Sequence, residues 1–116
     1  MTTCQMVIEP LADDAVLVAL EGELAGPSAY TLDSELLRVE RRRPASLVLD
    51  LSRLAFIDSA GLGRLLAAHR RAKRDGRRLL VVEGRGAVRR LLALTALDHQ
   101  LELYADARTA TAGLRV

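Results

Sequence analysis

A short apolar run at residues 46–51, Ser-Leu-Val-Leu-Asp-Leu, is the segment that says most about the architecture. Turn-forming residues bound it, and such a run is typical of a central strand that is covered on both faces. A second run of this kind follows at 79–82. The stretch between the two runs has helical spacing, so strands and helices alternate along this part of the chain. This order favours an α/β fold with a mixed sheet, in which the helices pack mainly against one face.

Two shorter runs at the beginning of the chain predict an opening hairpin. Residues 5–9 and 15–21 are rich in β-branched and apolar types, and Asp13-Asp14 between them supplies a turn. A helix is then predicted from Pro27 to the arginines at 41–43, where the cations and Pro44 both indicate a helix end. We therefore expect two strands and one helix before the central strand.

The second half of the chain predicts three more helices and a last strand. Irregular structure from Leu54 leads into a helix that closes at Asp75-Gly76, and another helix extends from about Arg85 to Leu94. In the first of these helices we expect Leu62, Leu65, Leu66, His69 and Ala72 on the buried face, and Arg64, Arg71 and Arg74 on the other side. A short strand at 101–104 precedes a helix that Asp106 caps and that reaches Leu114. The prediction is a mixed sheet of four to five strands with about four helices.

Length and composition limit the possible functions. With 116 residues, 50% of them hydrophobic, the chain is expected to form one domain, residues 1–116. We see no apolar run of membrane-spanning length, so no membrane insertion is expected and the cytoplasm is the expected location. The single cysteine, Cys4, and two histidines form no metal-ligand cluster, so no metal and no cofactor is predicted. Aromatic content of 3% and a net charge of +2 argue against direct nucleic-acid binding.

The turn into the helix after the central strand carries the candidate functional residues. Asp58 and Ser59 are both favourable N-cap types, and the glycines at 61 and 63 keep the first helical turn slim, so another surface can approach closely. A cap and a regulatory site are compatible, because the free N–H groups at a helix N-terminus also accommodate a phosphate. The residues alone leave both interpretations open.

The segment Asp-Ser-Ala-Gly-Leu-Gly at 58–63, after the strand Leu-Val-Leu-Asp-Leu, resembles the signature of the STAS domain family and its anti-sigma factor antagonists. The resemblance extends over nearly the whole chain, through Gly-Glu-Leu at 22–24, the Gly76 break and Val-Arg-Arg-Leu-Leu at 88–92. It implies the STAS fold for the predicted α/β arrangement. It also implies that the serine after the aspartate, Ser59, is phosphorylated by the anti-sigma factor, a serine kinase, and that a phosphoserine phosphatase reverses the reaction.

What the resemblance implies is a partner switch that regulates transcription in a bacterial stress response. The unphosphorylated chain would bind the anti-sigma factor, and phosphorylation of Ser59 would break the complex. The partner-binding residues are then expected around the serine and on the preceding loop: Asp58, Ala60, Gly61, Leu62, Gly63, Glu23, Leu24 and Ala25. Ala25 departs from the family, which usually has an aspartate there. An alternative with the same fold is a STAS accessory subunit of a lipid-transport or stress-signalling assembly that is not phosphorylated.

Three other interpretations have less support. Ser59 lacks the glycine two residues earlier that a nucleophile elbow needs, and His69 would lie about 15 Å along the helix, so no enzyme activity is predicted. Gly84-Arg85-Gly86 has Arg89 where a dinucleotide fingerprint needs its third glycine. A basic cluster is interpreted as a solvated helix end or as a docking rim for an acidic partner; it comprises Arg70, Arg71, Lys73, Arg74, Arg77 and Arg78.

Overall fold

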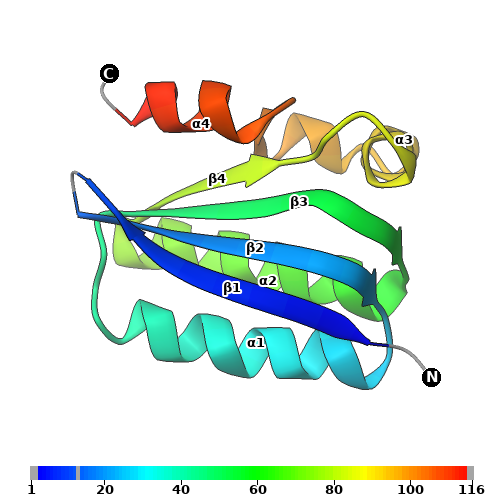
Figure 1. Cartoon of the computed structure of the whole chain (residues 1–116), viewed down its shortest axis with the longest axis horizontal. Coiled ribbons are helices and arrows are strands. Elements are labelled where there is room, and N and C mark those ends of the chain that lie inside the picture. The colour runs from blue at the N-terminus through cyan, green and yellow to red at the C-terminus, as the bar shows by residue number, and fades with distance from the viewer. Residues whose placement is uncertain (1–2, 13, 115–116) are drawn as a thin grey trace.

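The computed structural model, which describes residues 3–12 and 14–114, contains one five-stranded mixed sheet and four α-helices (Figure 1). The elements occur in the order β1 (Cys4–Leu11), β2 (Ala15–Leu24), α1 (Pro27–Glu40), β3 (Ser46–Ile57), α2 (Ser59–Asp75), β4 (Arg78–Val82), α3 (Ala87–Leu94), a 3₁₀ turn η1 (Leu97–His99), β5 (Glu102–Tyr104) and α4 (Ala107–Gly113). The strands follow one another across the sheet in chain order. Only β1 and β2 pair antiparallel, and the other neighbours are parallel. The predicted mixed α/β sheet is confirmed.

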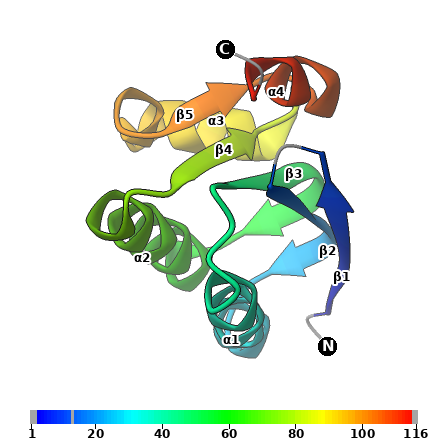
Figure 2. The ribbon, with the colours of Figure 1, turned by 90° about the vertical axis from the view of Figure 1, so that its left-hand side faces the viewer.

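Three helices cover one face of the sheet and α4 covers part of the other. Alternate residues of β3 and β4, such as Leu49 and Val81, point into a core shared with α1, α2 and α3. Their neighbours Val48 and Leu80 point the opposite way and pack against Ala110 of α4. Figure 2 shows α1 and α2 on one side of the sheet and α4 on the other. The two central strands are therefore covered on both faces, as their continuous apolar runs predicted.

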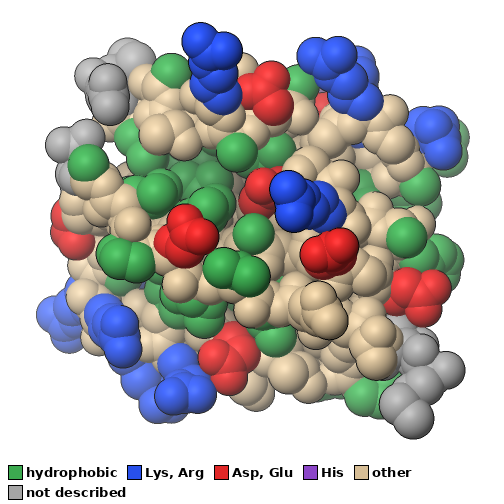
Figure 3. Space-filling view, viewed as in Figure 1, with side chains coloured by type: hydrophobic (Ala, Val, Ile, Leu, Met, Phe, Trp, Pro, Cys, Tyr) green, Lys and Arg blue, Asp and Glu red, His purple; other side chains and the backbone are tan. Residues whose placement is uncertain are grey.

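The face that carries α4 is partly open. The seven-residue α4 lies over β3, β4 and β5, and beside it a shallow groove of about 290 Å³ crosses β1 and β2. Val7, Leu17 and Ala19 contribute apolar side chains to this groove, with Glu9 and Glu21 among the charged ones. Figure 3 views the molecule from the direction of Figure 1 and shows apolar side chains with scattered charges.

Two strands are longer than predicted. The second strand was expected to end at Glu21 and the third at Leu51, with irregular structure from Leu54; the structure extends them to Leu24 and Ile57. The extra residues pair with each other, Glu23 opposite Phe56 and Leu24 opposite Ile57, across a ladder with two register shifts. The sequence of each extension does not predict a strand, because each extension becomes regular only by pairing with the other.

Helix α2 differs from the predicted face assignment. Its buried residues are Gly61, Leu65, Ala68 and Ala72, so Ala68 belongs to the buried stripe, while Leu62, Leu66 and His69 are only partly buried. Arg71 is outside this buried stripe, and its guanidinium joins α2 to α1 through pairs with Glu40 and Asp33. The third predicted helix begins at Ala87, two residues after Arg85, and the η1 turn was not predicted.

Candidate functional site

The candidate site lies where β2 and β3 end and α1 and α2 begin. Because β2 and β3 are parallel, their C-terminal ends lie at the same end of the sheet. The helix that follows each strand starts there (Figure 1). The chain leaves β2 at Leu24, turns through Ala25 and Gly26, and enters α1 at Pro27. It leaves β3 at Ile57, passes Asp58 and enters α2 at Ser59. The two loops that the sequence singled out are therefore neighbours in space.

Asp58 joins these two loops with its carboxylate. Its Oδ1 accepts a hydrogen bond from the Gly61 N–H at 2.8 Å, which caps α2. Its Oδ2 accepts one from the Gly26 N–H at 3.0 Å, just before the first turn of α1. Of the two candidate caps in the sequence, the structure thus assigns the role to Asp58. The bonds from Gly61 and then Gly26 lower the pKa of this carboxyl below its ordinary value, so Asp58 is a carboxylate at neutral pH.

Ser59 is the first residue of α2, and its side chain is exposed. Its hydroxyl has no hydrogen-bond partner among the described residues. Asp58 takes up the cap position. No side-chain hydrogen bond to the described residues therefore gives Ser59 a role in stabilising the fold. An exposed hydroxyl next to a carboxylate can be modified without first unfolding the turn.

Gly61 brings α2 close to the end of β2. A Cβ atom at this position would lie 2.6 Å from the Leu24 carbonyl oxygen and 2.7 Å from the Ile57 Cγ1. Real Cβ atoms do not approach other atoms so closely, so this approach requires glycine. Gly63 differs, since a Cβ there would meet nothing within 4 Å. The two glycines of the motif therefore have different roles.

The predicted partner-binding residues divide into exposed and buried ones. Glu23 is exposed, and Ala60, Leu62 and Gly63 are partly accessible on the first turns of α2. The side chain of Leu24 is fully buried, and Ala25 and Gly61 are also buried. Side-chain contact with a partner is thus open to the first group, while the second group positions the loops.

Sequence reasoning missed Ser28, which organises the loop before α1. Its buried hydroxyl accepts a hydrogen bond from the Ala25 N–H at 2.9 Å and lies 2.9 Å from the carbonyl oxygens of Glu23 and Ala25, to one of which it donates. A serine directly after a proline at a predicted helix start is a signal for such a local turn. This network holds Ala25 in place, at the position where the family resemblance predicts an aspartate.

Two aromatic residues were also missed. Of the three aromatic side chains in the sequence, Tyr30 and Phe56 are 60% and 49% exposed. Phe56 lies opposite Glu23 and two residues before Asp58. Tyr30 lies on the first turn of α1, under the guanidinium of Arg64 from α2, whose carbon is 5.6 Å from the ring centre. The sequence did contain a signal for them. In a chain whose core is built from aliphatic residues, the few aromatic ones are candidates for a role at the surface.

Asp58→Asn is expected to lower the melting temperature by about 5 °C. An asparagine has one acceptor oxygen, so it can serve Gly61 or Gly26 but leaves the other N–H opposite its own amide NH₂. Because the pKa of Asp58 is depressed from 3.8, its contribution is present at neutral pH and is lost as the pH falls through the folded-state pKa. Thermal unfolding at several pH values should therefore show the two proteins converging in acid.

Asp106→Asn is the matched control. Asp106 also caps a helix and also has a lowered pKa, but only its Oδ1 accepts, from the N–H and the hydroxyl of Thr109. An asparagine oxygen can replace that single acceptor, so this variant should melt within about 2 °C of the wild type at neutral pH. Equal losses in the two variants would contradict the bridging role of Asp58.

The comparisons with known proteins identify the family of this chain. Residues 8–110 match the family model of the STAS domain, and the chain belongs to this family. An anti-sigma F factor antagonist from Paenibacillus polymyxa is 28% identical over 102 residues, which cover 87% of each chain. Among solved structures, an anti-sigma factor antagonist from Mycobacterium paratuberculosis superposes with a TM-score of 0.90 at 29% identity, covering 98% of this chain and 96% of the other.

The fold also extends to a more distant protein. The Bacillus cell-fate determinant SpoIIAA in its phosphorylated form superposes with a TM-score of 0.73 at 17% identity, over 95% of this chain and 99% of that one. Among residues 3–12 and 14–114, no helix is both long and apolar enough to cross a membrane. The same residues include no group of three or more histidine, cysteine or acidic side chains suited to a metal ion.

Proposed function

We propose that this chain is an anti-sigma factor antagonist that acts in the cytoplasm as a regulator and not as an enzyme. In this proposal the unphosphorylated chain binds an anti-sigma factor, which then releases its sigma factor. The relatives named as anti-sigma factor antagonists, which cover most of the chain, support this role. The observation that carries it furthest is the exposed Ser59 at the start of α2, with the adjacent cap position taken up by Asp58.

The switch in this proposal is phosphorylation of Ser59 by the anti-sigma factor. The kinase transfers the γ-phosphoryl group of ATP to the Ser59 oxygen, ADP leaves, and the hydroxyl proton passes to a base of the kinase. A phosphoserine phosphatase restores the hydroxyl by hydrolysis. This chain supplies only the acceptor and its surroundings.

The surroundings of Ser59 explain why a phosphate would disrupt binding. A helix N-terminus ordinarily favours a phosphate through its free N–H groups. Here the Asp58 carboxylate already accepts from the Gly61 N–H, so the phosphate would meet a like charge on the neighbouring residue. In a protein interface this repulsion adds to the cost of removing the phosphate from water.

The test is the intact mass of the chain after incubation with ATP, magnesium and a candidate anti-sigma factor from the source organism. We expect the wild type to gain one phosphate and Ser59→Ala to gain none. Phosphate on both proteins would identify another acceptor, and phosphate on neither, with a kinase that is active on its own substrates, would contradict the proposed switch.

One observation favours a second function, that of a STAS accessory subunit that is not phosphorylated. Ala25 is buried at the position where the family resemblance predicts an aspartate, so the surface near Ser59 lacks the acidic group that the resemblance implies. An accessory subunit would bind its assembly whether or not position 59 is charged. Binding that is unchanged in Ser59→Asp would favour this function.

Phe56→Ala is expected to weaken binding to the anti-sigma factor more than about tenfold, because exposed aromatic side chains that become buried in an interface often dominate its affinity. The ring is 49% exposed beside Glu23 and the turn with Ser59, so its loss should change the stability of the free chain little. Isothermal titration calorimetry measures the affinity directly.

Leu37→Ala provides the control for Phe56→Ala. Leu37 is also an exposed apolar residue, but it lies on α1 about 15 Å from Pro27, toward the other end of the helix. Its removal should leave the affinity within about twofold. If Leu37→Ala weakened binding as much as Phe56→Ala, the proposed position of the interface would be wrong.

A further inference from the structure

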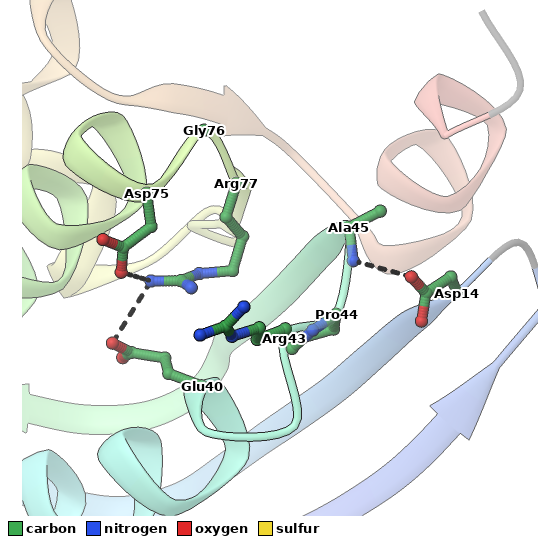
Figure 4. A pocket seen from close by; sticks show the side chains of 8 residues that line it. All are labelled: Asp14, Glu40, Arg43, Pro44, Ala45, Asp75, Gly76 and Arg77. Carbon is green, nitrogen blue, oxygen red and sulfur yellow. Dashed lines mark hydrogen bonds and ion pairs between the residues drawn. The ribbon is translucent and has the colours of Figure 1, made fainter.

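A cavity of about 490 Å³ lies at the end of the molecule opposite Ser59. It is found where α1 and α2 end and β3 begins, beside the turn between β1 and β2 (Figure 4). Its lining residues are Asp14, Glu40, Arg43, Pro44, Ala45, Asp75, Gly76 and Arg77. The volume falls within the range of small-molecule sites, about 300–1,000 Å³. The lining is mostly polar, so any ligand must be recognised through charge and hydrogen bonds.

The carboxylate of Glu40 is already satisfied by the protein. Its Oε1 accepts from Arg71 Nε at 2.7 Å and from Arg77 Nη2 at 3.2 Å, and its Oε2 accepts from Arg71 Nη2 at 2.9 Å. The Glu40 side chain is 8% exposed, so these charges are paired away from solvent. Two arginines thus neutralise one carboxylate, although Arg71 also contacts Asp33. Glu40 has little capacity left to bind a cation or to repel an anion.

The other two acidic residues of the lining are also engaged. Asp75 accepts from Arg74 Nε at 2.9 Å and from Arg77 Nη2 at 3.5 Å, and Arg74 lowers the pKa of its carboxyl. Asp14 accepts from the Ala45 N–H at 3.2 Å through its Oδ2. The acidic side chains therefore hold the walls of the cavity together.

The basic side chains of the lining have unused donors. Arg77 makes both of its ion pairs through Nη2, which leaves Nε and Nη1 without a hydrogen-bond partner among the described residues. Its side chain is 5% exposed, so this guanidinium is a fixed and nearly buried charge. Arg43 makes no ion pair within residues 3–12 and 14–114.

Arg43 lines the cavity from an unusual backbone conformation. Arg43 has a φ of 52°, in the left-handed region, although it precedes Pro44 and is not a glycine. Such a conformation is uncommon for a long side chain and disfavoured before proline. In Figure 4 the guanidinium of Arg43 extends into the same space as the guanidinium of Arg77 and the carboxylate of Glu40. A guanidinium that forms no ion pair with the described residues thus lies beside a nearly buried one.

We propose that this cavity binds a small oxyanion, such as the phosphate group of a phosphate monoester, between the guanidinium groups of Arg43 and Arg77. Guanidinium groups present paired N–H donors that match phosphate oxygens. Exposed Arg41 and Lys73, at the ends of α1 and α2, raise the local concentration of anions. This binding site is separate from the surface around Ser59 and does not depend on the proposed function.

The test uses the full chain labelled with ¹⁵N and titrated with inorganic phosphate at constant ionic strength. We expect saturable shifts of the Ala45 and Gly76 amide signals, which report on the cavity lining. Arg43→Asn should weaken phosphate binding roughly tenfold or more, because it removes a charge-assisted donor pair. Asparagine tolerates the left-handed conformation, so the loop should persist; an unchanged melting temperature checks this.

Arg42→Asn is the matched control, since it removes the same charge from the adjacent exposed position without touching the cavity. Phosphate binding within about twofold of the wild type is expected for this variant. Equal weakening in both variants, or shifts that never saturate, would overturn the proposal, because general attraction to a basic surface would then explain them. Sedimentation with phosphatidylglycerol vesicles but no saturable binding of free phosphate would overturn it as well.

Discussion

Ser59→Asp is expected to weaken binding to the anti-sigma factor by about two to three orders of magnitude. An uncompensated charge buried in an interface costs roughly 3–5 kcal/mol, and each 1.4 kcal/mol is a factor of ten in affinity. The new carboxylate would stand next to Asp58, whose own carboxylate cannot move away because Gly61 and Gly26 hold both of its oxygens. Calorimetric titration of the anti-sigma factor with each variant measures the loss.

Ser59→Asp should change binding without harming the fold. An acidic residue in the first turn of a helix interacts favourably with the helix dipole, so the melting temperature should stay constant or rise slightly. Ser59→Ala keeps the site neutral and should bind like the wild type. Ser34→Asp adds the same charge at an exposed position in the middle of α1. Its affinity for the anti-sigma factor should stay within about threefold of the wild-type value. Equal binding of Ser59→Asp and Ser34→Asp would refute the switch.

Gly61→Ala is expected to destabilise the chain by about 2–3 kcal/mol, the cost of forcing an extra carbon into a closely packed site. The new Cβ would meet the Leu24 carbonyl oxygen, a backbone atom that cannot swing aside, at 2.6 Å. Relief requires α2 to move away from the end of β2, which would also break the link from Asp58 to Gly26. Chemical denaturation measures the stability, and anti-sigma factor binding should fall with it.

Gly63→Ala should have the opposite effect. The same substitution two residues further along α2 adds a Cβ with nothing within 4 Å, so only the gain in helix propensity remains. We expect a stabilisation of about 0.5–1 kcal/mol, measured in the same denaturation experiment. If the two alanine variants were equally stable, the close approach of α2 to Leu24 would not be a feature of the molecule.

The salt bridges between helices show where sequence reasoning reaches its limit. The basic cluster at the end of α2 was interpreted as a solvated helix end or a docking rim. The structure does place Arg74 on the surface, at the exposed end of the helix. Arg71 and Arg77 instead form partly buried pairs with Glu40, 31 and 37 residues earlier. Helical periodicity predicts which residues share a face, but it does not predict which neighbour that face meets.

The sequence by itself determined the order and type of most elements, because apolar periodicity and the local signals of turns and caps act within a few residues. It also placed Ser59 at a helix start and Asp106 at a cap, as the structure has them. Only the tertiary structure decided that Asp58 caps α2 while holding Gly26, that Gly61 admits no side chain, and that Arg43 and Arg77 share one cavity. The bond to Gly26, the packing against Leu24 and the shared cavity each join segments more than about thirty residues apart in the chain, and chain closure over such distances depends on the packing of the whole sheet.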